Sequence, residues 1–230
     1  MIVPIGGVLD PDRLSRIRAL LSEARFEDGR RTAGWHAREA KRNEQAAADD
    51  PRAREAAAMV SAALLANAVF RAAALPRRLR PVLLARYRCV AEGSPAYDLH
   101  VDDALMGMSD PSGPTRADVS VTVFLADPGT YEGGELVLDS PGGEAAYKLG
   151  AGDAIAYPAT TLHRVAPVTA GERLVAVTWA QSLVRDPAAR EVLFDLAAAR
   201  IAVHAREGAG ETFHRIARSY ANLLRMWAET

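Results

Sequence analysis

Glycine-rich turns divide the central part of the chain into short apolar segments. From residue 119 to residue 125, valine and leucine occupy every second position, which is the two-residue period of a β-strand. Further short segments follow, separated by turns at Gly133-Gly134, Gly150–Asp153 and Gly171-Glu172. Short strands with turns at this spacing are typical of an antiparallel sandwich or barrel, such as a jelly roll.

Helical patterns flank this region. Asp10-Pro11 and Asp186-Pro187 are helix start signals, with aspartate as N-cap and proline at the first helical position. The alanine-rich stretch from about Asp49 to Ala74 predicts one long helix, and a last helix is expected from about Glu211 to Trp227. The apolar face predicted for the helix after Pro187 consists of Val192, Leu193, Leu196 and Ile201.

These patterns predict an α+β fold and a single domain, residues 1–230. Residues 79–183 are expected to form the jelly-roll core. Residues 1–78 are expected to give helical support and a possible lid, and residues 184–230 to form helices packed on the core.

The composition narrows the choice of partners. The 28 basic and 29 acidic residues nearly cancel, so neither nucleic acid nor an anionic membrane is expected as the main partner. The single cysteine, Cys89, excludes an intrachain disulfide and fits a reducing compartment. No apolar run approaches the ~20 residues of a membrane span, and the N-terminus lacks the features of a signal peptide. We therefore expect a cytoplasmic protein, with a homo-oligomer as an open possibility.

One imidazole and one carboxylate lie two residues apart within Tyr97–Asp103. On an extended strand His100 and Asp102 share a side, because strand side chains alternate. His163, about sixty residues later, can complete a set of two histidines and one carboxylate. Such a set binds one face of Fe(II) and leaves the other open for a co-substrate and dioxygen. Arg173, ten residues beyond His163, could hold the distal carboxylate of a 2-oxoacid.

Plain structural roles are the alternatives for these residues. His100 and Asp102 alone also fit a hydrogen-bonded pair at a strand end. Asp103 points away from His100 on a strand, so Asp102 is the preferred carboxylate ligand. Trp179 shares a strand face with Arg173 and is either a core aromatic residue or a wall of the iron pocket.

Six stretches of the sequence carry a family resemblance. They are Arg31–Gly34, Lys41–Gln45, His100–Ala104, Tyr131–Leu136, Trp179–Asp186 and Asn222–Glu229. In these stretches the chain resembles the bacterial PKHD-type hydroxylases, which are Fe(II)- and 2-oxoglutarate-dependent dioxygenases related to prolyl 4-hydroxylase. The resemblance extends from about Phe26 to the C-terminus, and the last two stretches are its most specific parts.

The resemblance implies a double-stranded β-helix core and a set of ligands. His100, Asp102 and His163 match the iron ligands of the family, and Arg173 matches its 2-oxoglutarate anchor. The implied cofactors and co-substrates are Fe(II), 2-oxoglutarate and dioxygen, with ascorbate to keep the iron reduced.

Two further residues are implied as contacts of 2-oxoglutarate. Tyr87 resembles a tyrosine that hydrogen-bonds the co-substrate in prolyl hydroxylase relatives. Phe124 falls where those relatives often carry another tyrosine. Ser120 or Thr122, on the same side of the strand as Phe124, could replace the missing hydroxyl.

The polar segment from Thr32 to Gln45 has two interpretations. Its composition fits a solvated loop leading into a helix. Because the family resemblance is concentrated there, the alternative is a lid that closes the mouth of the barrel, with Lys41, Asn43 or Gln45 reaching the substrate. The candidate substrate contacts are Asn43, Arg116 and Trp179.

The function expected from these residues is that of an oxidoreductase, which couples the oxidative decarboxylation of 2-oxoglutarate to the oxidation of an unidentified substrate. A non-catalytic iron or 2-oxoglutarate sensor is the alternative on the same fold. A zinc- or manganese-dependent cupin is a third hypothesis, but it gives no reason for a buried carboxylate anchor at Arg173.

Overall fold

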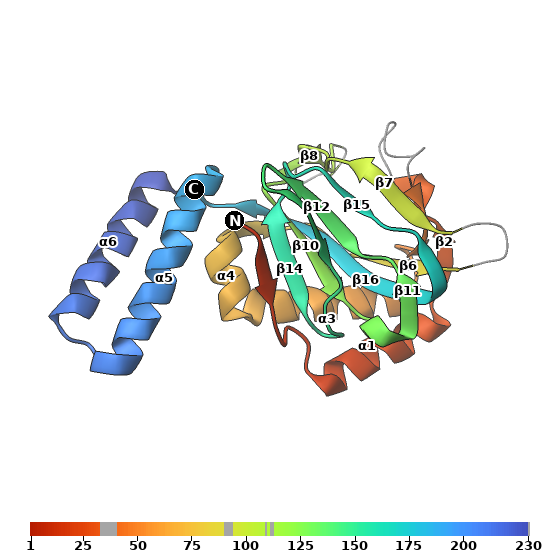
Figure 1. The fold of residues 1–230 in the computed structure, drawn as a ribbon, viewed down its shortest axis with the longest axis horizontal. Coiled ribbons are helices and arrows are strands. Elements are labelled where there is room, and N and C mark those ends of the chain that lie inside the picture. Colours follow the sequence, from red (N-terminus) through yellow and green to blue (C-terminus); the bar gives the residue numbers. More distant parts are fainter. Residues whose placement is uncertain (33–40, 90–93, 109, 111–112, 230) are drawn as a thin grey trace.

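The computed structural model describes residues 1–32, 41–89, 94–108, 110 and 113–229. The chain combines helices with antiparallel β-sheets (Figure 1). The helices are α1 (Pro11–Glu23), α3 (Pro51–Ala66), α4 (Ala68–Ala74), α5 (Pro187–Glu207) and α6 (Glu211–Trp227), with 3-10 turns η1 (Gly29–Thr32) and η2 (Pro128–Thr130).

The strands alternate with short connections along most of the chain. They are β1 (Val3–Ile5), β2 (Phe26–Asp28), β3 (Lys41–Arg42), β4 (Glu44–Ala46), β5 (Pro76–Leu79), β6 (Leu83–Arg88), β7 (Ala96–His100), β8 (Leu105–Met106), β9 (Thr115–Arg116), β10 (Val119–Phe124), β11 (Tyr131–Gly133), β12 (Leu136–Ser140), β13 (Gly143–Tyr147), β14 (Ala154–Pro158), β15 (His163–Val165) and β16 (Val168–Ser182).

Two sheets contain nearly all of these strands. The larger has the order β1-β14-β10-β16-β6-β4-β2, and both β5 and β11 also pair with β16. The smaller has the order β13-β12-β15-β7-β3, and β8 pairs with β9 as a separate ribbon. The long strand β16 pairs with four others, so it fixes the positions of every side chain that it carries.

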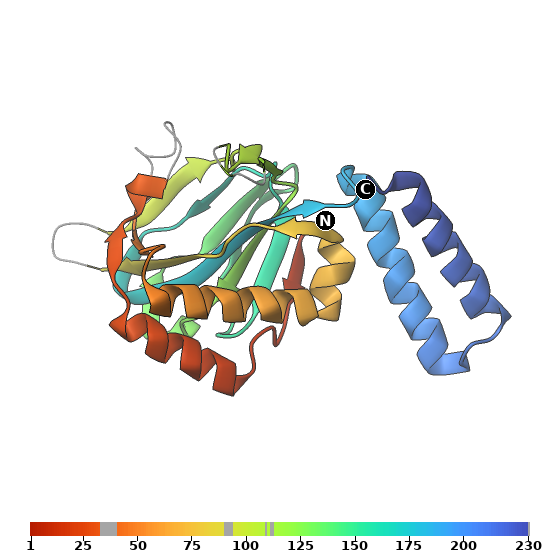
Figure 2. The ribbon, with the colours of Figure 1, turned by 180° about the vertical axis from the view of Figure 1, so that it is seen from behind.

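Apolar side chains cover both faces of the larger sheet. One face packs on α1 and α3, which lie side by side across it (Figure 2). The other face contributes Phe124, Ile155 and Val175 to a second cluster with Leu136 and Leu138 of the smaller sheet. Because both faces are covered, every residue of β10 is buried. Alternate residues of β10 therefore face two different buried clusters, and neither face of the strand is exposed to solvent.

The helix starts follow the sequence signals, whereas the single helix predicted from Asp49 to Ala74 is wrong. Asp10 and Asp186 cap α1 and α5. Asn67 separates α3 from α4, which are bent by 79°. Its backbone N–H donates to the carbonyls of α3, and its side chain accepts from Phe70 N. One asparagine thus ends one helix and caps the next.

For Lys41 to Gln45, the interpretation as a solvated loop leading into a helix is also wrong. Residues 33–40 lie outside the described residues. Lys41 and Arg42 form β3 at the edge of the smaller sheet, and Glu44–Ala46 form β4 in the larger one. Residues 41–46 therefore connect the two sheets through two short strands.

The C-terminal helices form a hairpin at one side of the sheets (Figure 1). Helix α5 contacts α4 and α6, and Leu193 joins Leu75 and Val184 in a small buried cluster. The predicted apolar face of α5 is only partly buried, since Val192 and Ile201 are exposed. The division into residues 1–78, 79–183 and 184–230 stays a prediction.

Within the described part of the chain, no single helix is long and apolar enough to cross a membrane. The α3–α4 pair reaches the required length and composition only as two helices joined at the 79° bend.

Candidate functional site

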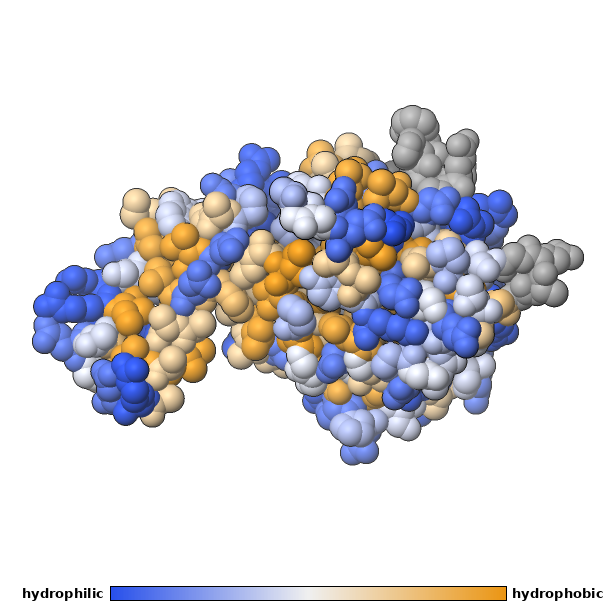
Figure 3. All heavy atoms as spheres, viewed as in Figure 1, coloured by the Kyte–Doolittle hydropathy of each residue, from blue (hydrophilic) through white to orange (hydrophobic). Residues whose placement is uncertain are grey.

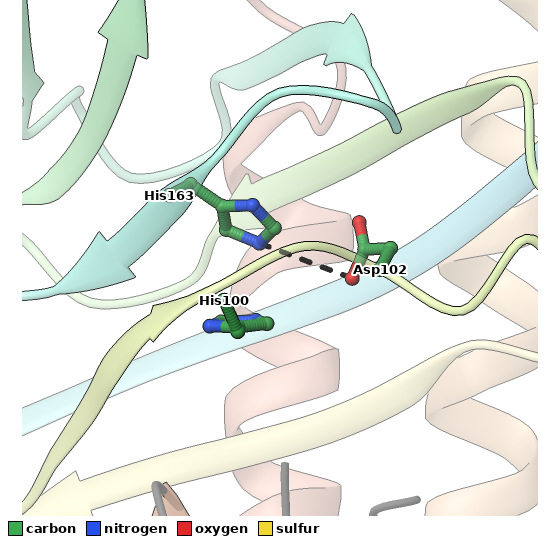
Figure 4. Close-up of side chains that lie close together, drawn as sticks. All are labelled: His100, Asp102 and His163. Carbon is green, nitrogen blue, oxygen red and sulfur yellow. Dashed lines mark ion pairs between the residues drawn. The ribbon is translucent and has the colours of Figure 1, made fainter. Parts of the chain in front are cut away.

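Three side chains converge between the sheets (Figure 4). His100 ends β7, His163 begins β15, and these two residues are register partners on neighbouring antiparallel strands. Asp102 approaches from the segment after β7, with Oδ1 3.9 Å from His163 Nε2. One potential ligand atom of each residue lies within 4.8 Å of the other two.

Backbone carbonyls set the tautomer of both histidines. His100 Nδ1 lies 2.7 Å from the Asp98 carbonyl oxygen, and His163 Nδ1 lies 2.9 Å from that of Thr161. A carbonyl oxygen only accepts, so each Nδ1 donates a proton, and Nε2 is the nitrogen that carries the lone pair when the ring is neutral. Burial, reinforced by the neighbouring His163, lowers the pKa of His100 to about 4. Two imidazoles and a carboxylate fit the donor set that Fe(II) takes.

Asp102 is not on the strand that the His-x-Asp spacing suggested. β7 ends at His100, and β7 and β15 pair with a register shift that sets two residues of β7, Asp98 and Leu99, opposite one residue of β15, Arg164, as in a β-bulge. The Ser120 hydroxyl donates a hydrogen bond to Asp102 Oδ2. Ser120 therefore touches a candidate metal ligand, and it is Thr122, two residues along β10, that lines the pocket. Asp103, which strand parity placed on the opposite face, lines the pocket as well.

A pocket of about 460 Å³ is lined by the three candidate ligands, His100, Asp102 and His163. Its walls come from both sheets, with Tyr97 and His163 on the smaller sheet and Tyr87, Arg173 and Trp179 on the larger.

Arg173 is the most deeply buried cation in the pocket, at 1% exposure. Its guanidinium carbon lies 5.0 Å from the ring centroid of Tyr87 and 5.8 Å from that of Phe124. Among the described residues Arg173 makes no ion pair, and its Nε has no hydrogen-bond partner. Since a buried guanidinium without an anion is costly, this arrangement fits a pocket that takes an anionic ligand.

The segment before α3 contributes three polar side chains to the pocket. Lys41, Asn43 and Gln45 are all buried and line it. Burial lowers the pKa of Lys41 to about 8, against the opposing charges of Asp102 and Asp28. These residues alternate with Arg42 and Glu44, so the strand period is present with its polar residues facing inward.

Of the other two candidate substrate contacts, Trp179 lines the pocket and Arg116 does not. Trp179 lines the pocket, and its buried Nε1 has no partner within the described part of the protein. Arg116 is not brought to the pocket: its Nε lies 2.7 Å from Asp118 Oδ1, and one terminal nitrogen lies 3.0 Å from Glu229 Oε2. Arg116 thus ties the C-terminal residues to β9.

Two pocket tyrosines were not predicted from the sequence. Tyr97 stacks on His100 with ring centroids 3.6 Å apart, and Tyr157 lies edge-on to His163 at 5.2 Å. Tyr157 could have been predicted from strand periodicity, because it lies on the same strand face as the apolar Ile155. Tyr97 could not have been predicted in this way. It lies three residues before His100, so strand alternation places it on the opposite face, and only the bulge in β7 brings the two rings together.

Apolar side chains gather at the mouth of the pocket. Val101, Leu105 and Met108 line it and are also exposed, Met108 to 70%. Figure 3 shows apolar atoms beside β8 and along the α5–α6 hairpin. Exposed apolar groups next to a polar cavity are a common feature of binding sites.

Comparison with known proteins agrees with this geometry. Residues 82–181 match the 2OG-Fe(II) oxygenase superfamily, and residues 188–229 match the PKHD-type hydroxylase C-terminal domain. PKHD-type hydroxylases from Gloeothece citriformis and Synechococcus elongatus are 47% and 46% identical to the chain over 229 residues, with 100% of both sequences covered. The chain belongs to the PKHD-type hydroxylase family. As a member of this family it is an oxidoreductase of the hydroxylase type.

Solved structures share the fold of this PKHD-type hydroxylase at lower identity. A prolyl-4-hydroxylase from Pseudomonas putida matches with a TM-score of 0.52 and 17% identity, over 79% of this chain and 92% of its own. A viral collagen prolyl hydroxylase from Paramecium Bursaria Chlorella virus-1 matches with a TM-score of 0.51 and 20% identity, over 79% and 95%.

Proposed function

We propose that this PKHD-type hydroxylase couples the oxidative decarboxylation of 2-oxoglutarate to the oxidation of a C–H bond in a second substrate. The observation that carries the proposal is Arg173, a buried guanidinium without an ion-pair partner among the described residues. Arg173 lines the same pocket as His100, Asp102 and His163. A zinc- or manganese-dependent hydrolase or isomerase would have no use for such an anchor.

Each residue has a definite task in this proposal. His100, Asp102 and His163 would hold Fe(II), and Arg173 would pair with the distal carboxylate of 2-oxoglutarate. Bound iron, together with 2-oxoglutarate and dioxygen, supplies the oxidising chemistry, and ascorbate keeps the iron reduced. The two facing sheets form the walls of a double-stranded β-helix, which orients these groups and excludes water.

The mouth of the pocket favours a substrate with an apolar surface. Val101, Leu105 and Met108 offer exposed apolar contacts beside the ligands. One structural neighbour, a prolyl hydroxylase from Trichoplax adhaerens, was solved with a peptide fragment. For the present chain we propose only that the oxidised C–H lies on or next to an apolar group, because burying such a group against this rim is favourable.

Formation of succinate from 2-oxoglutarate in air tests the proposal. Protein loaded with Fe(II) is incubated with 2-oxoglutarate and extracted substrate pools, and succinate and substrate oxidation are measured by mass spectrometry. We expect Fe(II)-dependent succinate and a matching mass increase of 16 Da, the mass of one oxygen atom, in a substrate. Tight binding of both iron and 2-oxoglutarate without succinate, whatever pool is supplied, would indicate a sensor instead.

A further inference from the structure

Asn43, which directly precedes β4, forms one row with Tyr87 of β6 and Arg173 of β16. Tyr87 of β6 is the register partner of Arg173 of β16. On the other side of β6, Glu44 pairs with Arg86 and Gln45 with Ala85, so the same antiparallel register places Asn43 opposite Tyr87. All three side chains are buried and line the pocket.

The side chain of Asn43 lies against the backbone of Gly29. The backbone N–H of Gly29 donates to the Asn43 carbonyl at 2.9 Å. A Cβ atom at position 29 would lie 1.9 Å from Asn43 Oδ1, so this oxygen lies directly against the Gly29 backbone. The Oδ1 atom is buried without a hydrogen-bond partner in the described structure. Because the oxygen lies on the Gly29 side, the amide Nδ2 is the group left to face Tyr87.

The Tyr87 hydroxyl lies between Arg173 and Asn43, and both neighbours affect its pKa. Burial raises the pKa of Tyr87, while Arg173 on one side and Asn43 on the other act to lower it. Both neighbours therefore present donors or positive charge to the phenolic oxygen. The hydroxyl proton is then free to point to an acceptor in the pocket.

We propose that Asn43 is a positioning residue for 2-oxoglutarate: it holds the Tyr87 hydroxyl so that Tyr87 and Arg173 together bind the distal carboxylate. This inference rests on the proposed function, and it differs from a substrate contact by Asn43. Gly29 is part of this arrangement, because a Cβ atom at position 29 would displace the Asn43 amide.

The test is calorimetric titration of 2-oxoglutarate, without oxygen, into protein loaded with Mn(II) as an inert stand-in for Fe(II). Wild type is compared with Asn43→Ala, Gly29→Ala, Tyr87→Phe and the double variant Asn43→Ala/Tyr87→Phe. Gly142→Ala is the matched control for Gly29→Ala, since a Cβ there meets nothing closer than 3.8 Å. Mn(II) affinity and the unfolding temperature are measured for each protein.

We expect the Kd for 2-oxoglutarate to rise about three- to tenfold in Asn43→Ala, the effect of one hydrogen bond, and to rise similarly in Gly29→Ala. Mn(II) affinity should stay unchanged. The double variant should match Tyr87→Phe, because Asn43 acts through the hydroxyl that this substitution removes. Loss of stability alone would not produce this non-additivity.

Two outcomes would overturn the inference. One is an unchanged Kd in Asn43→Ala, and the other is additive effects of Asn43→Ala and Tyr87→Phe. If wild type itself bound no 2-oxoglutarate, the proposed function would fall and the inference with it.

Discussion

His100 and His163 face each other across β7 and β15, with ring centroids 4.2 Å apart. Both rings are turned by hydrogen bonds from Nδ1 to backbone carbonyls two residues earlier in the chain. Because the spacing between paired strands is fixed by the backbone ladder, the two candidate nitrogen ligands already lie side by side in the metal-free fold.

Replacement of His163 by alanine should abolish Fe(II) binding and leave the fold intact. The two sheets are held by their apolar clusters, and not by the metal ligands. Anaerobic metal titration and circular dichroism check both statements. His204→Ala, on the exposed side of α5, is the control. Normal iron binding by His163→Ala would remove this residue from the ligand set.

Ser120→Ala should weaken Fe(II) binding by about tenfold, the size of effect expected when a hydrogen bond that orients a ligand is lost. The Ser120 hydroxyl donates to Asp102 Oδ2, and Asp102 has no strand pairing to hold it in place. Metal titration of Ser120→Ala and of Ser22→Ala, an exposed control, measures the effect. Equal affinities in the two variants would show that Asp102 needs no such support.

Arg173→Ala should raise the Kd for 2-oxoglutarate by an amount that corresponds to about 2–5 kcal/mol, because a buried carboxylate would lose its charged partner. Arg173→Lys should restore only part of this affinity, since lysine keeps the charge and loses the two-pronged geometry. Titration of metal-loaded protein provides the values. The assignment would be wrong if Arg173→Ala bound 2-oxoglutarate as wild type does.

Lys41→Met should stabilise the metal-free protein at pH 7. Burial lowers the pKa of Lys41 from 10.5 to about 8, so below pH 8 the folded state carries a buried charge at a cost of about 3 kcal/mol. Between pH 8 and 10.5 the unfolded chain binds more protons than the folded one, and wild-type stability rises with pH. The advantage of Lys41→Met should therefore shrink across this window.

Urea unfolding at several pH values measures this difference in the free energy of unfolding. Lys148→Met removes the other lysine of the chain and controls for the loss of a lysine as such. A constant difference between wild type and Lys41→Met from pH 7 to pH 10.5 would contradict the explanation.

Local signals in the sequence predicted the structure well where they depend on neighbouring residues. Asp10 and Asp186 cap their helices as expected. The break at Asn67 was missed because alanine on both sides favours an unbroken helix. Periodicity also failed at Lys41, Asn43 and Gln45, where the strand turns polar side chains inward toward the pocket.

The candidate site was accessible from the sequence only in part. Spacing and family resemblance singled out His100, Asp102, His163 and Arg173, and the structure places these residues in one pocket. Contacts between residues far apart in the sequence have no local sequence pattern from which they could be predicted. The ion pair that draws Arg116 to Glu229, 113 residues away, could not be derived from the sequence.

The most direct test of the central claim is the visible absorption of Fe(II)-loaded protein on addition of 2-oxoglutarate without oxygen. A 2-oxoacid that chelates Fe(II) produces a charge-transfer band, so one spectrum reports the metal and the co-substrate in the same site. We predict a saturable band for wild type that is absent in His163→Ala. The absence of the band in wild type, or its persistence in His163→Ala, would contradict the account.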